Sequence, residues 1–184
     1  MERRRALKLT ATICGGTIVG SGLFLAGCKN EARAEGLFLQ EDIGFMDGIG
    51  EVILPETAES PGAKAARIGD FMKTIVTDCY SEEEQQVFLR GLQEIRRLSD
   101  EHYNQPFLQL DESEKQELLT GLHQEALARS QGELPHYFSM IKQLTIWGYF
   151  TSEPGATMAL RYNPVPGRYE ACIPYKAGDK AWAE

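Results

Sequence analysis

The chain of 184 residues lacks the short motifs that mark common enzyme sites. It has no Gly-rich phosphate loop, no G-x-S-x-G elbow, no C-x-x-C pair and no dinucleotide fingerprint after a strand. Its three histidines, His102, His123 and His136, are interpreted as packing or surface residues, and Glu133-Leu-Pro-His136 is one lone E-x-x-H unit at a helix start. The sequence therefore predicts no catalytic, cofactor-binding or metal-binding residue in this chain.

Positive charge is scarce outside the N-terminus. The net charge of -8 at pH 7 reflects 19 Lys and Arg against 27 Asp and Glu, and because residues 1–27 carry +3, the remainder carries -11. Nucleic-acid binding depends on Lys and Arg side chains that neutralise phosphates. The acidity of residues 28–184 therefore excludes nucleic acid as a partner. The length and the 42% apolar content fit one globular domain with a real core.

Uncharged runs are also few, and the longest of them, Leu9 to Cys28, follows a basic start. The basic segment, the uncharged run and the small residues at its end predict that residues 1–27 are an export signal. A membrane-spanning anchor is the alternative, since about 20 residues can cross a bilayer. Five glycines and four hydroxyl residues lower the hydropathy of the run and favour a cleaved signal.

The signal matches a particular export route. Arg3, Arg4, Leu7 and Lys8 resemble the twin-arginine pattern, with Ala6 where Phe is usual, and weak hydropathy suits that route. The twin-arginine translocase is therefore an expected partner.

Two candidate cleavage sites end the signal. Leu25-Ala26-Gly27-Cys28 resembles a lipobox, in which Cys28 would be lipidated, and Ala32-Arg33-Ala34 is an ordinary cleavage site. The lipobox is favoured because it directly follows the apolar run. We expect a lipid anchor to hold the protein on the periplasmic side of a bacterial membrane.

Helix punctuation recurs beyond a linker over residues 28–39, and strand alternation barely occurs. Residues 40–150 therefore predict an all-α compact domain of about five helices. The expected helices span residues 40–54, 67–79 after a cap at Ser60-Pro61, 81–103 from a Ser81/Glu84 capping box, a fourth capped by Asp111, and a fifth from about Pro135 to Gly148 or Phe150. The second helix should bury Ile68, Phe71, Ile75 and Cys79.

Residues 151–184 are rich in proline, glycine and aromatics, so they cannot form another long helix. They predict an irregular, extended C-terminal arm, with a short hairpin as the alternative. Its aromatics either fold back over the chain's own helices or cover a partner protein. The candidate partner-interface residues are Tyr149, Phe150, Tyr162 and Tyr169.

The cysteines leave three alternatives open. Cys14 should leave with the signal and Cys28 would be lipidated, so the exported domain keeps Cys79 and Cys172 in an oxidising compartment. They could form an internal disulfide, Cys172 could bridge to another subunit, or both could stay free.

Several segments together resemble one known family. They are Ile53-Leu54-Pro55-Glu56-Thr57, Ser60-Pro61-Gly62-Ala63, Leu144 to Ser152, and Val165-Pro166-Gly167-Arg168-Tyr169. Their order and spacing resemble the gluconate 2-dehydrogenase subunit 3 family. The resemblance implies a small, mainly helical, non-catalytic subunit of a membrane-associated sugar or sugar-acid dehydrogenase. The implied partners are a large FAD-dependent subunit of the glucose-methanol-choline type and a cytochrome c subunit carrying haem c.

The resemblance also implies a role for the signal. A flavin subunit takes up FAD in the cytoplasm, so it must cross the membrane folded, and the twin-arginine route carries folded proteins. The small subunit would then escort and stabilise a partner that has no signal. The alternative hypothesis is a freestanding, membrane-tethered lipoprotein that binds a ligand or another protein. An autonomous enzyme is the third hypothesis.

Overall fold

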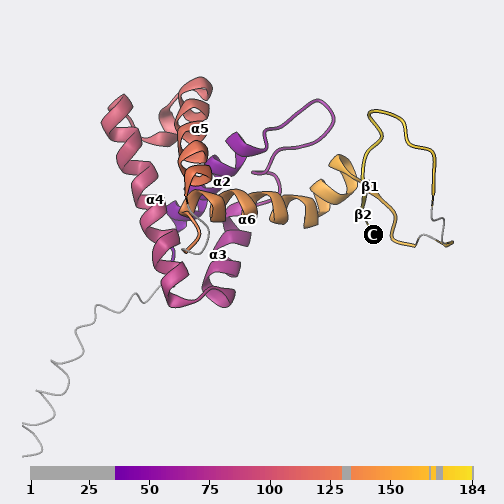
Figure 1. Ribbon diagram of the computed structural model, residues 1–184, viewed down its shortest axis with the longest axis horizontal. Helices are drawn as coiled ribbons and strands as arrows, with labels where there is room; N and C mark the ends of the chain where they lie inside the picture. Colours follow the sequence, from indigo (N-terminus) through magenta and orange to yellow (C-terminus); the bar gives the residue numbers. More distant parts are fainter. Residues whose placement is uncertain (1–35, 130–133, 166, 169–171, 184) are drawn as a thin grey trace, which may run out of the picture. The chain divides into compact units, whose positions relative to one another are not determined.

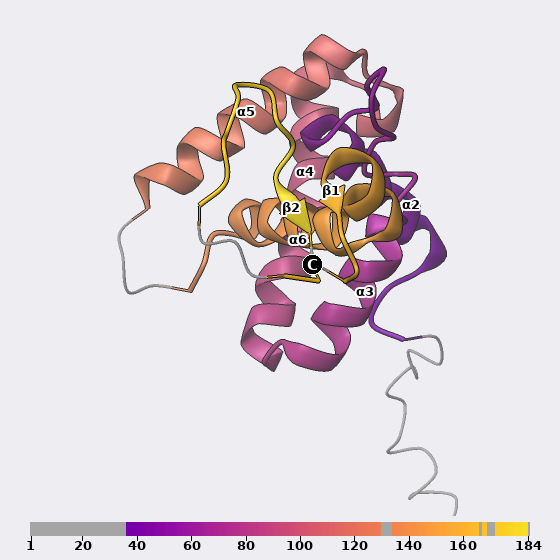
Figure 2. The same cartoon turned by 90° about the vertical axis from the view of Figure 1, so that its right-hand side faces the viewer.

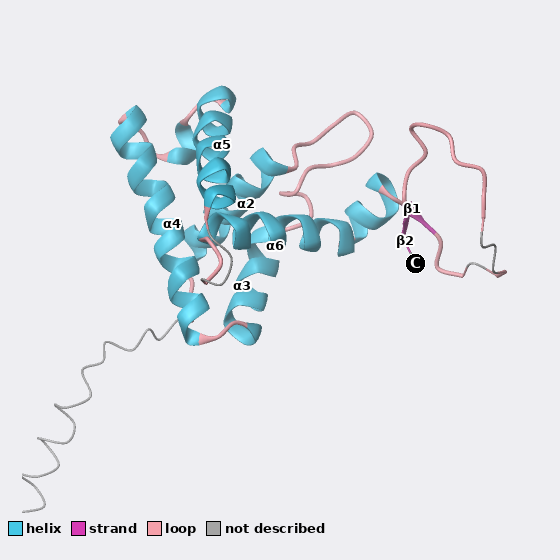
Figure 3. Cartoon of the chain, viewed as in Figure 1, coloured by secondary structure: helices cyan, strands magenta, loops and turns pink. Residues whose placement is uncertain are grey.

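The computed structural model describes residues 36–129, 134–165, 167–168 and 172–183. The chain separates into one unit of Met1–Leu37 and another of Phe38–Glu184, and the described helices and strands lie in the second. Within the described ranges this second unit has five α-helices, followed by a single π-helical segment and two short strands (Figures 1 and 3). The predicted all-α domain is confirmed.

The first helix among the described residues, α2, spans Gln40–Ile53, as expected from the stop at Pro55. Asp42 accepts the backbone N–H of Leu39 at 2.9 Å, which satisfies a free donor at the helix start. Phe38, in the predicted linker, is buried and packs edge-on against Phe88, with ring centroids 5.9 Å apart. The packed domain therefore begins before the helix does.

The next helix, α3, spans Ile68–Cys79, but its start differs from the prediction. Ser60-Pro61 does not cap it: these residues lie in the preceding loop, and Arg67 at the N-cap has φ 54°. The Asp47 carboxylate of α2 accepts the Gly69 N–H at 2.7 Å, so a distant side chain does the capping. Burial raises the pKa of Asp47.

The buried face of α3 is also rotated from the predicted one. Ile68 is buried as expected, but the other buried residues are Gly69, Met72 and Val76. Phe71 and Ile75 are half-buried and Cys79 is exposed.

Two helices begin at the predicted caps. In α4, Glu82–Tyr103, Ser81 accepts the Glu84 N–H at 3.3 Å, and the Glu84 carboxylate accepts the Ser81 N–H at 2.9 Å. In α5, Glu112–Ala128, Asp111 accepts the Glu114 N–H at 2.8 Å. Each pair closes a capping box, as the sequence pattern predicts.

The last α-helix, α6, spans Tyr137–Thr151 and contacts α2, α3, α4 and α5. It crosses the other helices and leads away toward the C-terminal segment (Figure 1). The core gathers around it, and its fully buried members include Met46, Ile49, Ile68, Met72, Val76, Phe88, Leu92, Ile95, Ile141 and Leu144.

The C-terminal arm, residues 151–184, contains a π-helical segment, η2 at Gly155–Ala159, and the strands β1 at Arg161–Tyr162 and β2 at Trp182–Ala183. The strands pair in parallel, so they are not a hairpin. They lie beyond the end of α6 in Figure 1 and in front of it in Figure 2. The remaining described residues of the arm are mostly without regular structure, as predicted.

Candidate functional site

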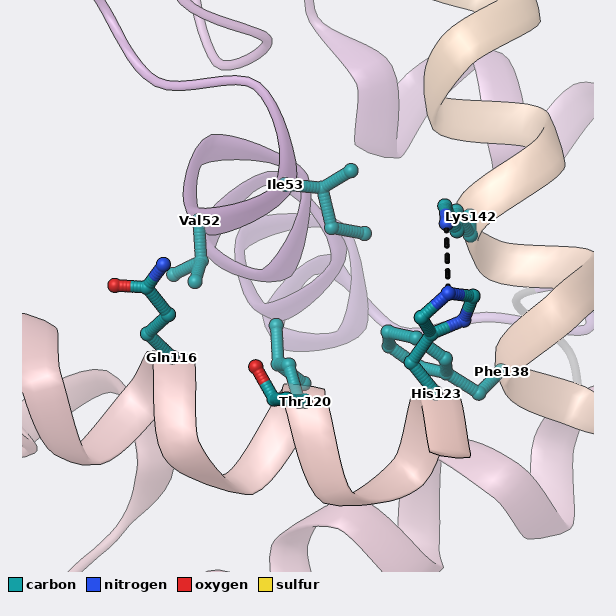
Figure 4. Close-up of a pocket in the computed structure, with 8 residues that line it drawn as sticks. Val52, Ile53, Gln116, Thr120, His123, Phe138 and Lys142 are labelled. Carbon is teal, nitrogen blue, oxygen red and sulfur yellow. Dashed lines mark hydrogen bonds between the residues drawn. The ribbon is translucent and has the colours of Figure 1, made fainter. Parts of the chain in front are cut away.

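Two adjoining pockets lie between α5 and α6 on the surface of the helical domain, and the C-terminal end of α2 also lines the first of them, which Figure 4 shows. Together we call them the α5–α6 groove; it is lined by Val52, Ile53, Gln116, Leu119, Thr120, His123, Leu127, Phe138, Ser139, Lys142, Gln143, Ile146 and Trp147. Its wider part has a volume of about 350 Å³. His123 and Lys142 line both parts, and their side-chain nitrogens lie 3.3 Å apart.

The position of this groove follows from helix geometry. Positions 139, 142, 143, 146 and 147 lie on one stripe of α6, and positions 116, 120, 123 and 127 lie on one stripe of α5. The opposite face of α6 holds core residues such as Ile141 and Leu144. The periodicity of the sequence predicted that inner face but not the outer stripe, because apolar Ile146 and Trp147 continue a stripe that begins with polar residues, so hydropathy does not mark it as one exposed face.

His136 is the N-cap of α6 and has a structural role. Its Nδ1 accepts the Phe138 N–H at 3.2 Å. Burial lowers the pKa of His136, which keeps the ring neutral and able to accept. Burial also raises the pKa of the neighbouring Tyr137 phenol. His123 lines the groove and His102 is exposed at the end of α4.

The four predicted interface residues have different environments. Tyr149 is buried, and its hydroxyl donates to Pro61 O at 2.6 Å, so it belongs to the chain's own core and is not available to a partner. Phe150 is half-buried and packs edge-on against Tyr149. Tyr162 is 50% exposed, and Tyr169 lies outside the described residues.

The arm exposes further apolar side chains. Val165 is 75% and Tyr175 is 76% exposed, and Ile173 and Trp182 are also exposed. Arg161 lies over the Trp182 ring at 4.0 Å from its centroid, which steadies the paired strands. Tyrosine, tryptophan and arginine are all enriched at protein interfaces.

Both cysteines of the described ranges, Cys79 and Cys172, are free and exposed. The internal disulfide is therefore not formed in this structure. Exposure of Cys172 is what a bridge to another subunit requires, and that bridge stays a prediction.

The predicted export residues, Arg3, Arg4, Leu7 and Lys8, and the predicted lipidation site, Cys28, lie outside the described residues. None of the helices in the described ranges combines the length and hydropathy that a bilayer span needs. In the same ranges, no three His, Cys, Asp or Glu side chains gather as metal ligands would.

Comparison with known families decides the identity. A family model described as gluconate 2-dehydrogenase subunit 3 matches residues 40–167, which is more than half of the chain. The chain belongs to the gluconate 2-dehydrogenase subunit 3 family. No curated protein and no solved structure matches it.

Membership of the gluconate 2-dehydrogenase subunit 3 family identifies an accessory subunit of an oxidoreductase complex. The match begins with α2 and extends past β1 into the arm, so it includes both walls of the α5–α6 groove. A subunit of a complex needs exposed apolar surface where it contacts its partners. This member of the family exposes apolar side chains in the groove and in the arm.

Proposed function

We propose that this chain is the non-catalytic small subunit of a periplasmic, membrane-associated, FAD-dependent gluconate or sugar dehydrogenase. The family match carries the proposal. The exposed apolar residues of the arm, Tyr162, Val165, Ile173 and Tyr175, support it, because a subunit of a stable complex needs apolar surface to bury. The catalytic flavin belongs to the large subunit, and a cytochrome c subunit takes the electrons.

The small subunit also escorts its partner during export. The Arg3-Arg4 signal recruits the twin-arginine translocase, which carries the folded flavoprotein with the small subunit bound. Transport as a pair requires an interface that survives translocation, of roughly 2,000 Å² or more. Lipidation of Cys28 then holds the complex on the periplasmic side of the membrane.

Export of the partner tests this proposal. The chain is expressed with the large subunit, and flavin and large subunit are measured in periplasmic and membrane fractions. The double variant Arg3→Lys, Arg4→Lys should leave both subunits in the cytoplasm. Arg5→Lys, at the variable position of the pattern, keeps the same net charge and should export normally.

Two outcomes contradict parts of the proposal. If the wild-type chain retains no flavoprotein on purification, it is not the small subunit of this enzyme. If the double variant still exports the large subunit at the wild-type level, the escort role is wrong, although a complex could remain.

A further inference from the structure

The α5–α6 groove exposes three large apolar side chains on the helical domain, apart from the arm. Leu127 is 66%, Trp147 is 50% and Ile146 is 39% exposed. A surface helix ordinarily carries polar residues on its outer face. An apolar cluster that spans two helices and a groove has the character of an interaction site.

The polarity of the groove changes along α6. Ser139, Lys142 and Gln143 make one end polar, and Ile146 and Trp147 make the other end apolar. Phe71 of α3 holds the Trp147 ring edge-on, with centroids 5.3 Å apart. A positioned tryptophan at the apolar end loses little freedom on binding and fits the part of an anchor residue.

Charge in the groove is opposite to that of the domain. Residues 40–159 hold 21 Asp and Glu against nine Lys and Arg. Among the described residues, the groove lining nevertheless includes no carboxylate, and Lys142 is its single Lys or Arg. The Lys142 ammonium faces His123 Nε2, and no ion pair among the described residues involves it. It is placed to receive a carboxylate from outside.

We infer that the large flavoprotein subunit docks in the α5–α6 groove through an amphipathic segment, whose apolar side chains cover Leu127 and Trp147 and whose carboxylate pairs with Lys142. The inference rests on the proposed function and locates its interface. A groove between two helices accepts side chains spaced as on one face of a third helix. The cation in an otherwise acidic domain selects an acidic residue on that segment and fixes its register.

Substitutions in the groove test the inference in the co-expressed complex. Leu127→Glu and Lys142→Glu should each weaken binding of the large subunit tenfold or more, measured as flavin retained per small subunit across a dilution series. Leu39→Glu is the matched control, because Leu39 is 52% exposed at the far end of α2 and does not line the groove. It should bind as the wild type does. Circular dichroism and thermal melting verify that each variant is folded.

Cross-linking gives a second readout that does not depend on stability. A photo-reactive benzoylphenylalanine replaces Gln143 in the groove or, as control, the exposed Gln93 of α4. Cross-links to the flavoprotein from position 143 and not from position 93 support the inference.

The outcomes separate this inference from the proposed function. If the wild-type complex forms but position 143 cross-links to lipid or to nothing, or if Leu127→Glu binds normally, the groove is not the docking site and the subunit assignment stands. If the wild-type chain binds no flavoprotein, the proposed function fails and the inference fails with it.

Discussion

The hydroxyl of Tyr149 donates a hydrogen bond to the backbone carbonyl of Pro61 at 2.6 Å, across 88 residues of sequence. It joins α6 to the loop between α2 and α3. The same loop is held from α2, where the Glu51 carboxylate accepts the Lys64 N–H at 2.8 Å. A long loop is thus fixed to two helices, and Tyr149 has a structural duty within its own chain.

Removing that hydroxyl should destabilise the domain. Tyr149→Phe leaves the Pro61 carbonyl without its donor, and we expect a loss of about 1–2 kcal/mol in the free energy of unfolding. Tyr175→Phe, at a side chain that is 76% exposed, should change it by less than about 0.5 kcal/mol. Urea denaturation measures both. Equal stability of the two variants would show that the bond contributes nothing.

Two helical glycines should respond oppositely to alanine. A Cβ on Gly148 would lie 2.5 Å from the Phe71 ring, whereas a Cβ on Gly121 would meet no atom within 4 Å. We expect Gly148→Ala to destabilise by about 1–3 kcal/mol through overpacking. Gly121→Ala should stabilise by up to about 1 kcal/mol through helix propensity. Chemical denaturation of the pair is decisive, and stabilisation by both would contradict close packing of α6 on α3.

The cap at His136 predicts a pH dependence. Because burial lowers the pKa of His136 in the folded chain, the unfolded chain binds the proton first as pH falls below about 6.5. Its contribution to stability is therefore full above that pH and is lost as pH falls through the lower folded value. Protonation also removes the acceptor for the Phe138 N–H.

His136→Asn should flatten the fall in melting temperature between pH 7.5 and 5.5, since Asn can cap the helix and does not titrate. His102→Asn, at an exposed position, should keep the wild-type slope. A His136→Asn variant as sensitive to acid as the wild type would place the titrating group elsewhere.

The two thiols should differ once the complex forms. In the isolated domain of residues 38–184 both Cys79 and Cys172 are exposed, so each should react with a thiol reagent, as counted by mass. If Cys172 bridges to another subunit, non-reducing electrophoresis of the complex gives a shifted band that Cys172→Ser abolishes and Cys79→Ser preserves. Two unreactive thiols in the isolated domain would instead indicate an internal disulfide.

Local chemistry made much of the fold predictable. Two helix starts were predictable from the pairs Ser81 with Glu84 and Asp111 with Glu114, because the donors and acceptors of a capping box lie within four residues. The start of α3 was not predictable in this way. Its cap comes from Asp47, 22 residues earlier, and no local pattern reports a partner that only packing brings near.

The candidate site was harder still. The exposed aromatics of the arm could be predicted from composition. The burial of Tyr149 could not, because the last turns of α6 are largely apolar and Tyr149 lies only two residues after the exposed Trp147. Which side of such a helix is covered depends on where α3 and α5 pack. The exposure of Trp147 and Ile146 is therefore evident only from the packing of the whole domain.

The parallel pairing of β1 with β2 has a practical consequence for anyone handling this protein. Arg161 N–H bonds to Ala181 O at 2.8 Å and Asn163 N–H to Ala183 O at 2.9 Å, so the closing residues of the sequence fasten the base of the arm. Removing residues 182–184 would delete β2 and the bond from Asn163 to Ala183, and would keep only the bond from Arg161 to Ala181 of these two. The arm would then be less ordered and would lose more entropy on binding. Expression designs should therefore keep Trp182 and Ala183, and should separate any C-terminal tag from them by a spacer.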